Sequence, residues 1–257
     1  MFDIYGISEL DYAKLNPSRQ SVSLVLVSEL FSMTERHLSL FPEFLRILVA
    51  SVSKDPNPYV EEAEALAEID WRFNEAEKRL ETSAASPARN VEQQIEILSR
   101  TYTGIVEGLY SIAMTNMAFA VSVLKSNTRT VREIERMPLR SRADIVSSYN
   151  PHIGAECGKP YVPVVRNAAS HGGIDTSHAP RIVFTDKMSG KTYACTCEEL
   201  GDLIRDLFRL ASMVATAVTI KGIYPDFVEV LKRVPPSKYM RYMDIGDIMA
   251  RMRLHGS

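Results

Sequence analysis

Cysteine is scarce in this chain, and the few that occur do not form obvious pairs. There are three in 257 residues, and a single residue separates Cys195 from Cys197, which is too short a spacing for an ordinary disulfide. No second pair of Cys or His residues stands at the spacing of a zinc site. We therefore expect a reduced, cytoplasmic protein that uses no metal ion and no other cofactor.

An excess of charge of one sign is also missing, because 30 Lys and Arg residues nearly balance 32 Asp and Glu residues. The formal net charge of -2 gives no overall attraction to polyanions, so any nucleic-acid surface has to be local. Residues 55–81 hold nine acidic side chains, whereas residues 129–142 hold five arginines and residues 221–253 hold seven basic side chains. The basic clusters are either solvated helix faces or a track for an RNA backbone.

A secretory leader and a long apolar run are not evident either. The first residues, Met1-Phe2-Asp3-Ile4, provide no basic segment ahead of an apolar one. The most apolar stretches, 22–31 and 112–124, are short or interrupted by Ser, Thr and Asn, so they fall below the length of a membrane span. We expect no membrane partner.

Apolar residues recur at helical spacing through most of the chain, which predicts an all-α protein. Helices are expected over 21–53 with a new start at Pro42, and over 59–81, 88–125, 129–147 with a division near Pro138, 164–172, 196–222, 224–234 and 238–253. Residues 181–186 and 191–196 are expected to form a small β-hairpin, and Thr196-Cys197-Glu198-Glu199 a capping box. Residues 148–163, which are rich in Gly and Pro, are expected to form a loop.

A Ser/Ala/Pro linker at residues 82–87 suggests a boundary in this helical chain. Residues 1–85 would form an N-terminal helical region, residues 86–222 the main domain, and residues 223–257 a C-terminal helical extension. The N-terminal region is either accessory or needed to complete the core, because its acidic helix carries an apolar stripe of Leu66, Ile69 and Phe73 that requires a packing partner.

Familiar catalytic signatures are absent: there is no Gly-rich phosphate loop followed by Lys-Ser/Thr, no His-Glu-x-x-His and no Asp-rich nuclease cluster. The most informative feature is the hexapeptide Arg166-Asn167-Ala168-Ala169-Ser170-His171, followed by Gly172-Gly173. At about 100° per residue, its four polar side chains share one arc of a helix, opposite small residues. Pro163 suits the entry of this helix and Gly172 its end. A guanidinium, an amide, a hydroxyl and an imidazole on one arc suit the handling of phosphate.

This string of elements resembles the HEPN superfamily, helical domains whose ribonuclease members carry Arg, a polar residue, three residues of any kind and His. Arg166, Asn167 and His171 fill the required positions, and the resemblance covers residues 88–222. It implies a HEPN-like helical bundle that cleaves RNA without a metal ion, as a homodimer whose two motif helices meet across a cleft. Many members of the superfamily are toxins or abortive-infection effectors of prokaryotic defence, and others have lost catalysis and serve as interaction modules.

The resemblance assigns catalysis to Arg166, Asn167 and His171. RNA cleavage without a metal needs a base for the 2′-hydroxyl, an acid for the departing 5′-oxygen and positive charge for the phosphorane. Histidine suits the first two roles because its unperturbed pKa is about 6.5. One chain supplies one motif histidine, so a homodimer would be needed to supply both the base and the acid. The expected products carry a 2′,3′-cyclic phosphate and a 5′-hydroxyl.

Four further residues are candidates for supporting or substrate-binding roles. Ser170 lies on the polar arc, Tyr102 and Glu107 lie on the helix over 88–125 that could face the motif, and His178 follows the motif closely in sequence. Core packing is the competing interpretation for Tyr102, and an ordinary loop histidine is the competing interpretation for His178.

The motif itself has a structural alternative, in which Arg166 and His171 only cross-link helices while Asn167 satisfies a loop carbonyl. The protein would then be a non-catalytic HEPN-like interaction or nucleotide-binding regulatory module. The catalytic interpretation instead predicts an endoribonuclease that acts as a toxin or antiphage-defence effector, with RNA as its substrate and an antitoxin or another defence-system protein as a possible partner.

Overall fold

The computed structural model describes residues 35–84, 88, 90–127, 129–177 and 180–221, and these residues are mostly helical with one small antiparallel sheet. The mainly α-helical character and the hairpin predicted from the sequence are confirmed. The helices are α3 (Glu35–Lys54), α4 (Asn57–Glu61), α5 (Ala63–Ala84), α6 (Val91–Gly104), the π-helix η2 (Ile105–Tyr110), α7 (Ser111–Leu124), α8 (Val131–Arg136), α9 (Leu139–Ser147), α10 (Pro151–Gly158), α11 (Pro163–His171) and α12 (Cys197–Lys221). The expected helices over 224–234 and 238–253 lie outside the described residues.

The sheet follows the motif helix directly. Its strands are β1 (Ile174–Asp175), β2 (Arg181–Thr185) and β3 (Thr192–Thr196), in the order β1-β2-β3 with antiparallel pairing throughout. The hairpin of β2 and β3 was predicted, and the short strand β1 was not, because two residues carry no alternating pattern. The predicted capping box at the start of α12 is present: Glu199 N–H donates to Thr196 Oγ1 over 3.1 Å, and Thr196 N–H donates to Glu199 Oε2 over 2.8 Å.

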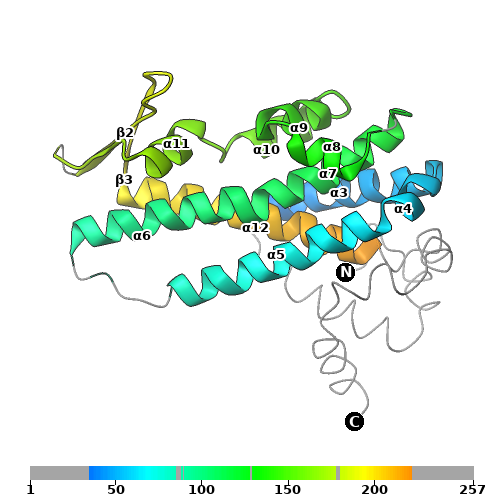
Figure 1. The fold of residues 1–257 in the computed structure, drawn as a ribbon, viewed down its shortest axis with the longest axis horizontal. Helices are drawn as coiled ribbons and strands as arrows, with labels where there is room; N and C mark the ends of the chain where they lie inside the picture. The colour runs from blue at the N-terminus through cyan, green and yellow to red at the C-terminus, as the bar shows by residue number, and fades with distance from the viewer. Residues whose placement is uncertain (1–34, 85–87, 89, 128, 178–179, 222–257) are drawn as a thin grey trace, which may run out of the picture.

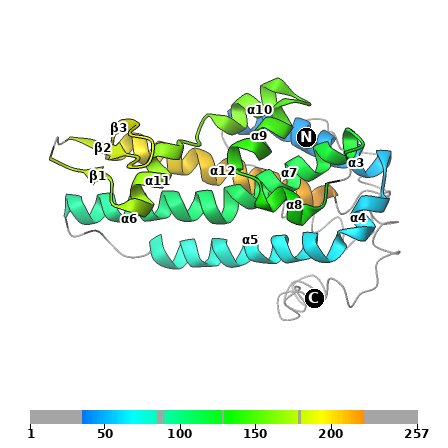
Figure 2. The same cartoon turned by 45° about the horizontal axis from the view of Figure 1, so that its top comes forward.

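A continuous helical rod of α6, η2 and α7 forms the axis of the fold, as predicted for 88–125. Figure 1 shows α5 along one side of this rod and α9 to α11 along the opposite side, and Figure 2 shows the same arrangement after rotation. Helix α8 packs against α7 and also contacts α5, through the ion pairs Arg132–Glu68 and Arg72–Glu135. Helices α3 and α12 also pack against the rod. By length and composition, the segment Val91–Leu124 could cross a membrane, but 78% of its most apolar window is buried inside the protein, as in the core helix of a globular fold.

The core does not divide at the expected linker near residues 82–87. One contiguous apolar cluster joins side chains of α3, α4 and α5 to those of α7, α11, β2 and α12, among them Phe41, Tyr59, Ile69, Phe119, Val165, Phe184 and Leu207. The part of residues 1–85 that the structure describes thus contributes to the same core as residues 88–221. The acidic helix α5 turns Leu66, Ile69 and Phe73 into that core, as its apolar stripe required.

Two expectations from Pro and Gly content were wrong. Residues 148–163 contain helix α10 instead of a continuous loop: Asn150 Oδ1 accepts from Ile153 N–H over 3.2 Å, and Pro151 occupies the first turn. Gly154 is needed there for packing, because a Cβ at this position would lie 1.9 Å from Ser147 Oγ. Helix α3 also runs through Pro42 without a new start. Burial of Phe41 and Phe44 on either side of the proline holds this turn in the core and offsets the lost hydrogen bond.

Candidate active site

The motif occupies helix α11, which begins and ends as the sequence predicted. Pro163 lies in its first turn, and Gly172 adopts φ 68° at its end, where an L side chain would be strained. The N–H groups of Gly172 and Gly173 both donate to the carbonyl of Ala168. Val165 and Ala168 are fully buried. Packing of this apolar face against the core holds the helix, and with it the backbone of the polar arc, in a fixed position.

The polar arc is divided between contacts with the protein and exposure to solvent. Arg166 and Asn167 are half-buried, whereas Ser170 and His171 are exposed at the end of the helix. Within the described residues, neither the His171 imidazole nor the Ser170 hydroxyl takes part in a hydrogen bond or ion pair. The imidazole is therefore accessible to a ligand. His178 lies outside the described residues.

Arg166 is oriented by an ion pair with Glu107. Its Nε and Nη2 lie 2.9 Å and 2.7 Å from Glu107 Oε1, and its Nη1 donates to Asn167 Oδ1 over 3.1 Å. The side chains of Arg166 and Glu107 are 38% and 50% exposed, and an ion pair at such a surface contributes only about 0–1 kcal/mol. The guanidinium is therefore held in place in the free protein but can exchange Glu107 for a phosphate at little cost.

Glu107 is placed for this contact by an irregular part of the rod. It lies in η2, and the rod there approaches α5 closely because Gly104 and Gly108 have no side chains. A Cβ at Gly108 would lie 2.9 Å from the Cβ of Ala76. A π-helical segment within a long α-helix is often found at a functional site. Sequence periodicity predicted the rod without its irregular segment.

Tyr102 lies in the core and not on the surface where a substrate would bind. It is fully buried, and its hydroxyl accepts from Val162 N–H over 2.7 Å and lies 3.2 Å from the carbonyl oxygen of Pro160, to which it donates. Burial raises the pKa of Tyr102 well above its ordinary value, and the hydrogen bond from Val162 acts in the opposite direction. Tyr102 therefore supports the motif by fixing the segment that enters α11.

Asn167 connects the motif helix to the β2–β3 turn. Its Nδ2 donates to Asp186 Oδ2 over 3.1 Å, and the same carboxylate accepts from Ser189 Oγ over 2.7 Å and from Met188 N–H over 3.0 Å. The hydrogen bonds from Ser189 and Asn167 lower the pKa of Asp186 to about 2. Asp186 therefore stays ionised and holds Asn167 in place. The structural alternative for the motif gave Asn167 a loop carbonyl as its partner, and the structure gives it a side-chain carboxylate.

Three residues near the motif were not predicted from the sequence. Asp186 is the first of them. The second is Lys187, whose Nζ lies 3.9 Å from the position that a Cβ of Gly172 would occupy. The third is Tyr161, which is half-buried: burial raises its pKa, while the charges of Arg166 and Arg142 lower it. The turn composition of Asp186-Lys187-Met188-Ser189-Gly190 predicted a hairpin, but not that its polar groups would meet α11.

The described residues include no group of three or more His, Cys, Asp or Glu side chains that could hold a metal ion. Cys157 and Cys195 are buried as free thiols and Cys197 is half-buried. Burial raises the pKa of Cys157 to about 12 and that of Cys195 to about 11. Both thiols thus stay protonated and suit packing better than nucleophilic chemistry.

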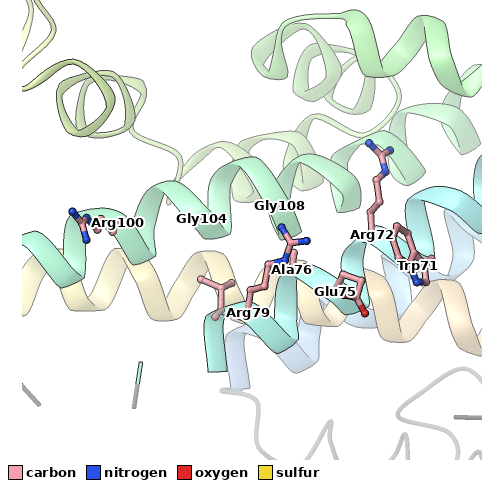
Figure 3. Close-up of a pocket in the computed structure, with 9 residues that line it drawn as sticks. Trp71, Arg72, Glu75, Ala76, Arg79, Arg100, Gly104 and Gly108 are labelled. Atoms are coloured by element: carbon pink, nitrogen blue, oxygen red, sulfur yellow. The ribbon is translucent and has the colours of Figure 1, made fainter. Parts of the chain in front are cut away.

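A separate groove of about 580 Å³ lies between α5 and the rod. Figure 3 shows Arg100 near one end and Trp71 near the other, with Arg79 between them. The full lining consists of Trp71, Arg72, Glu75, Ala76, Arg79, Leu80, Arg100, Gly104 and Gly108. None of the candidate catalytic residues belongs to this lining, and α5 and α11 lie on opposite sides of the rod in both overall views. Arg72 and Arg100 already pair with Glu135 and Glu96.

Comparison of the chain with protein-family models, with curated proteins and with solved structures gives no match.

Proposed function

We propose that this protein is a metal-independent endoribonuclease of the HEPN type. The observation that carries the proposal is the exposed His171 imidazole, five residues after the half-exposed Arg166 on a helix whose other face is buried. The Arg-polar-x3-His pattern thus coincides with a rigid helix that presents a titratable group and a permanent cation to solvent. These are the two kinds of group that RNA cleavage without a metal requires.

The chemistry follows from these groups. One imidazole takes the proton of a ribose 2′-hydroxyl, and the 2′-oxygen forms a bond to the adjacent phosphorus. The bond from phosphorus to the 5′-oxygen breaks, and a second, protonated imidazole gives its proton to that oxygen. Arg166 stabilises the charge on the equatorial phosphate oxygens. The products are a 2′,3′-cyclic phosphate and a 5′-hydroxyl.

A homodimer supplies the second imidazole in this proposal. One motif helix offers one histidine, and the exposed end of α11 allows the same surface of a second copy to approach around a two-fold axis. Two Arg166 and two His171 side chains would then face one phosphate.

The biological role that accompanies this chemistry is that of a toxin or antiphage-defence effector in the cytoplasm, controlled by an antitoxin or another defence-system protein. Unrestrained cleavage of cellular RNA arrests growth, so such an enzyme needs control. Its expression should inhibit growth, and His171→Ala should remove the inhibition.

A non-catalytic interaction or nucleotide-binding module is the second candidate. It is favoured by the fact that Arg166 and Asn167 both tie α11 to neighbouring elements, as a purely structural motif also would. His171 separates the two candidates, because it is exposed and, among the described residues, no hydrogen bond or ion pair gives it a structural role.

The test is incubation of the purified protein with single-stranded RNA in the presence of EDTA. We expect cleavage by the wild type and a loss of at least about a hundredfold in His171→Ala, the scale of deleting an acid–base group. The matched control is His152→Ala, which removes another exposed histidine, on α10, and should keep full activity. Equal activity of the two variants, or cleavage that requires magnesium, would refute the proposal.

A further inference from the structure

We infer that Lys187 adds a second permanent cation to the motif site and contacts a phosphate of the RNA beside Arg166 and His171. The inference rests on the proposed function, and it assigns substrate binding to a residue that the motif does not contain. Its basis is the way in which the β2–β3 turn is fastened to α11.

Two contacts fix the turn on either side of the motif's end. Asn167 Nδ2 donates to Asp186 Oδ2 over 3.1 Å, and Thr185 N–H donates to the carbonyl of Gly173 over 2.7 Å. The second contact requires glycine, because a Cβ at Gly173 would lie 2.0 Å from the carbonyl oxygen of Thr185. Lys187 follows these anchored residues directly, so its backbone has a defined place relative to α11.

The turn itself is also internally fixed. Its first residue, Asp186, donates from N–H to the carbonyl of Lys191 over 2.9 Å, and its carbonyl accepts from Gly190 N–H over 2.8 Å. Gly190 adopts φ 68°, a conformation that glycine reaches without strain. The ionised Asp186 carboxylate is buried and accepts hydrogen bonds from both the turn and Asn167. The turn therefore presents its exposed side chains from a rigid base.

The ammonium group of Lys187 lies beside the exposed end of the motif. Its Nζ is 3.9 Å from the position of a Cβ at Gly172, the residue that follows His171. In the part of the chain that the structure describes, this ammonium group forms no hydrogen bond and no ion pair. Arg166, by contrast, is paired with Glu107 in the free protein. Lys187 is thus an uncommitted cation beside Gly172, at the end of the helix that carries His171, where it can take a phosphate oxygen as its partner.

The experiment compares Lys187→Met with Lys191→Met, a variant that removes the same charge from another exposed lysine beside this turn. Binding is measured with a single-stranded RNA that is fully 2′-O-methylated and so cannot be cleaved, and cleavage is measured with the unmodified RNA. We expect Lys187→Met to weaken binding by about tenfold or more, the scale of one charge-assisted hydrogen bond. Lys191→Met should change it by less than about threefold, as a peripheral screened charge does. Lys187→Arg should retain most of the affinity, and all variants should have wild-type unfolding midpoints.

The outcomes separate this inference from the proposed function. If the wild type cleaves RNA and His171→Ala does not, but Lys187→Met binds and cleaves like Lys191→Met, the assignment of Lys187 is overturned and the ribonuclease remains. If no form of the protein cleaves RNA while Lys187→Met alone loses affinity for the methylated RNA, the phosphate contact is supported and the proposed catalysis fails.

Discussion

Asn167 and Asp186 join the motif helix to the β2–β3 turn through one hydrogen bond of 3.1 Å between Nδ2 and Oδ2. They lie 19 positions apart in the chain and in different kinds of secondary structure. The amide therefore faces a partner within the protein, while Arg166 and His171 on the same helix retain access to solvent. Asn167 thus positions α11 against the β2–β3 turn.

Asp186 should make the stability of the protein depend on pH below about 4. Its pKa falls from 3.8 to about 2 in the folded protein, so its contribution to the free energy of unfolding is complete above the unfolded value and is lost as the pH falls from about 4 through about 2. Urea unfolding of Asp186→Asn should show less loss of stability across this range than the wild type. The control Asp144→Asn, an exposed carboxylate on α9, should follow the wild type. If the free energy of unfolding of Asp186→Asn and of the wild type fell equally between about pH 4 and about pH 2, Asp186 would not stabilise the fold as proposed.

Arg166 and Glu107 should behave differently when each is replaced, although they are partners. If Arg166 binds the reacting phosphate, Arg166→Met should reduce cleavage by at least about a hundredfold, the scale of removing a charge that stabilises the transition state. Glu107→Gln breaks the same ion pair and should keep the rate within a few-fold of the wild type, because an exposed ion pair adds about 1 kcal/mol or less. Equal losses in the two variants would show that the ion pair, and not the guanidinium, is what matters.

The proposed composite site predicts a dimer in solution. Light scattering at the concentrations used for the cleavage assay should give twice the mass of the 28.8 kDa chain. Mixtures of Arg166→Met and His171→Ala chains should recover some activity if the two copies play unequal roles at one phosphate. A protein that remains a monomer while it cuts RNA at the wild-type rate would rule out the shared site.

The described residues 35–84, which end with helix α5, should be required for folding. Ile69 on α5 is 1% exposed, and Ile69→Ala should lower the free energy of unfolding by about 2–5 kcal/mol through lost burial and a cavity. Asn74→Ala on the same helix removes an exposed side chain and should change it by less than about 0.5 kcal/mol. Chemical denaturation of the two variants makes the comparison. A chain that begins near Ser86 should aggregate, and a stable fold of that chain would contradict the shared core.

The sequence predicted the elements whose signals are local. The capping box at Thr196 and Glu199, the end of α11 at Gly172 and the β2–β3 hairpin each depend on residues a few positions apart. Helix α8 likewise ends just before the division expected near Pro138, and α9 follows it.

Features that depend on distant contacts were beyond local signals. Gly154 suggested a loop, but its lack of a side chain serves the packing of α10 against Ser147. The hydrogen bond between Asn167 and Asp186 and the burial of Tyr102 could not be predicted, because no local sequence signal identifies the residues that they contact. The sequence therefore predicted which side chains share the polar arc of α11, but not which residues contact them.

The chemical nature of the product ends, measured by mass spectrometry after cleavage of a defined RNA in EDTA, tests the proposed ribonuclease most directly. We expect a 2′,3′-cyclic phosphate on one fragment, a 5′-hydroxyl on the other, and no cleavage at a position that carries a 2′-O-methyl group. Fragments that end in a 3′-hydroxyl and a 5′-phosphate, or cleavage that continues at the methylated position, would contradict this proposal.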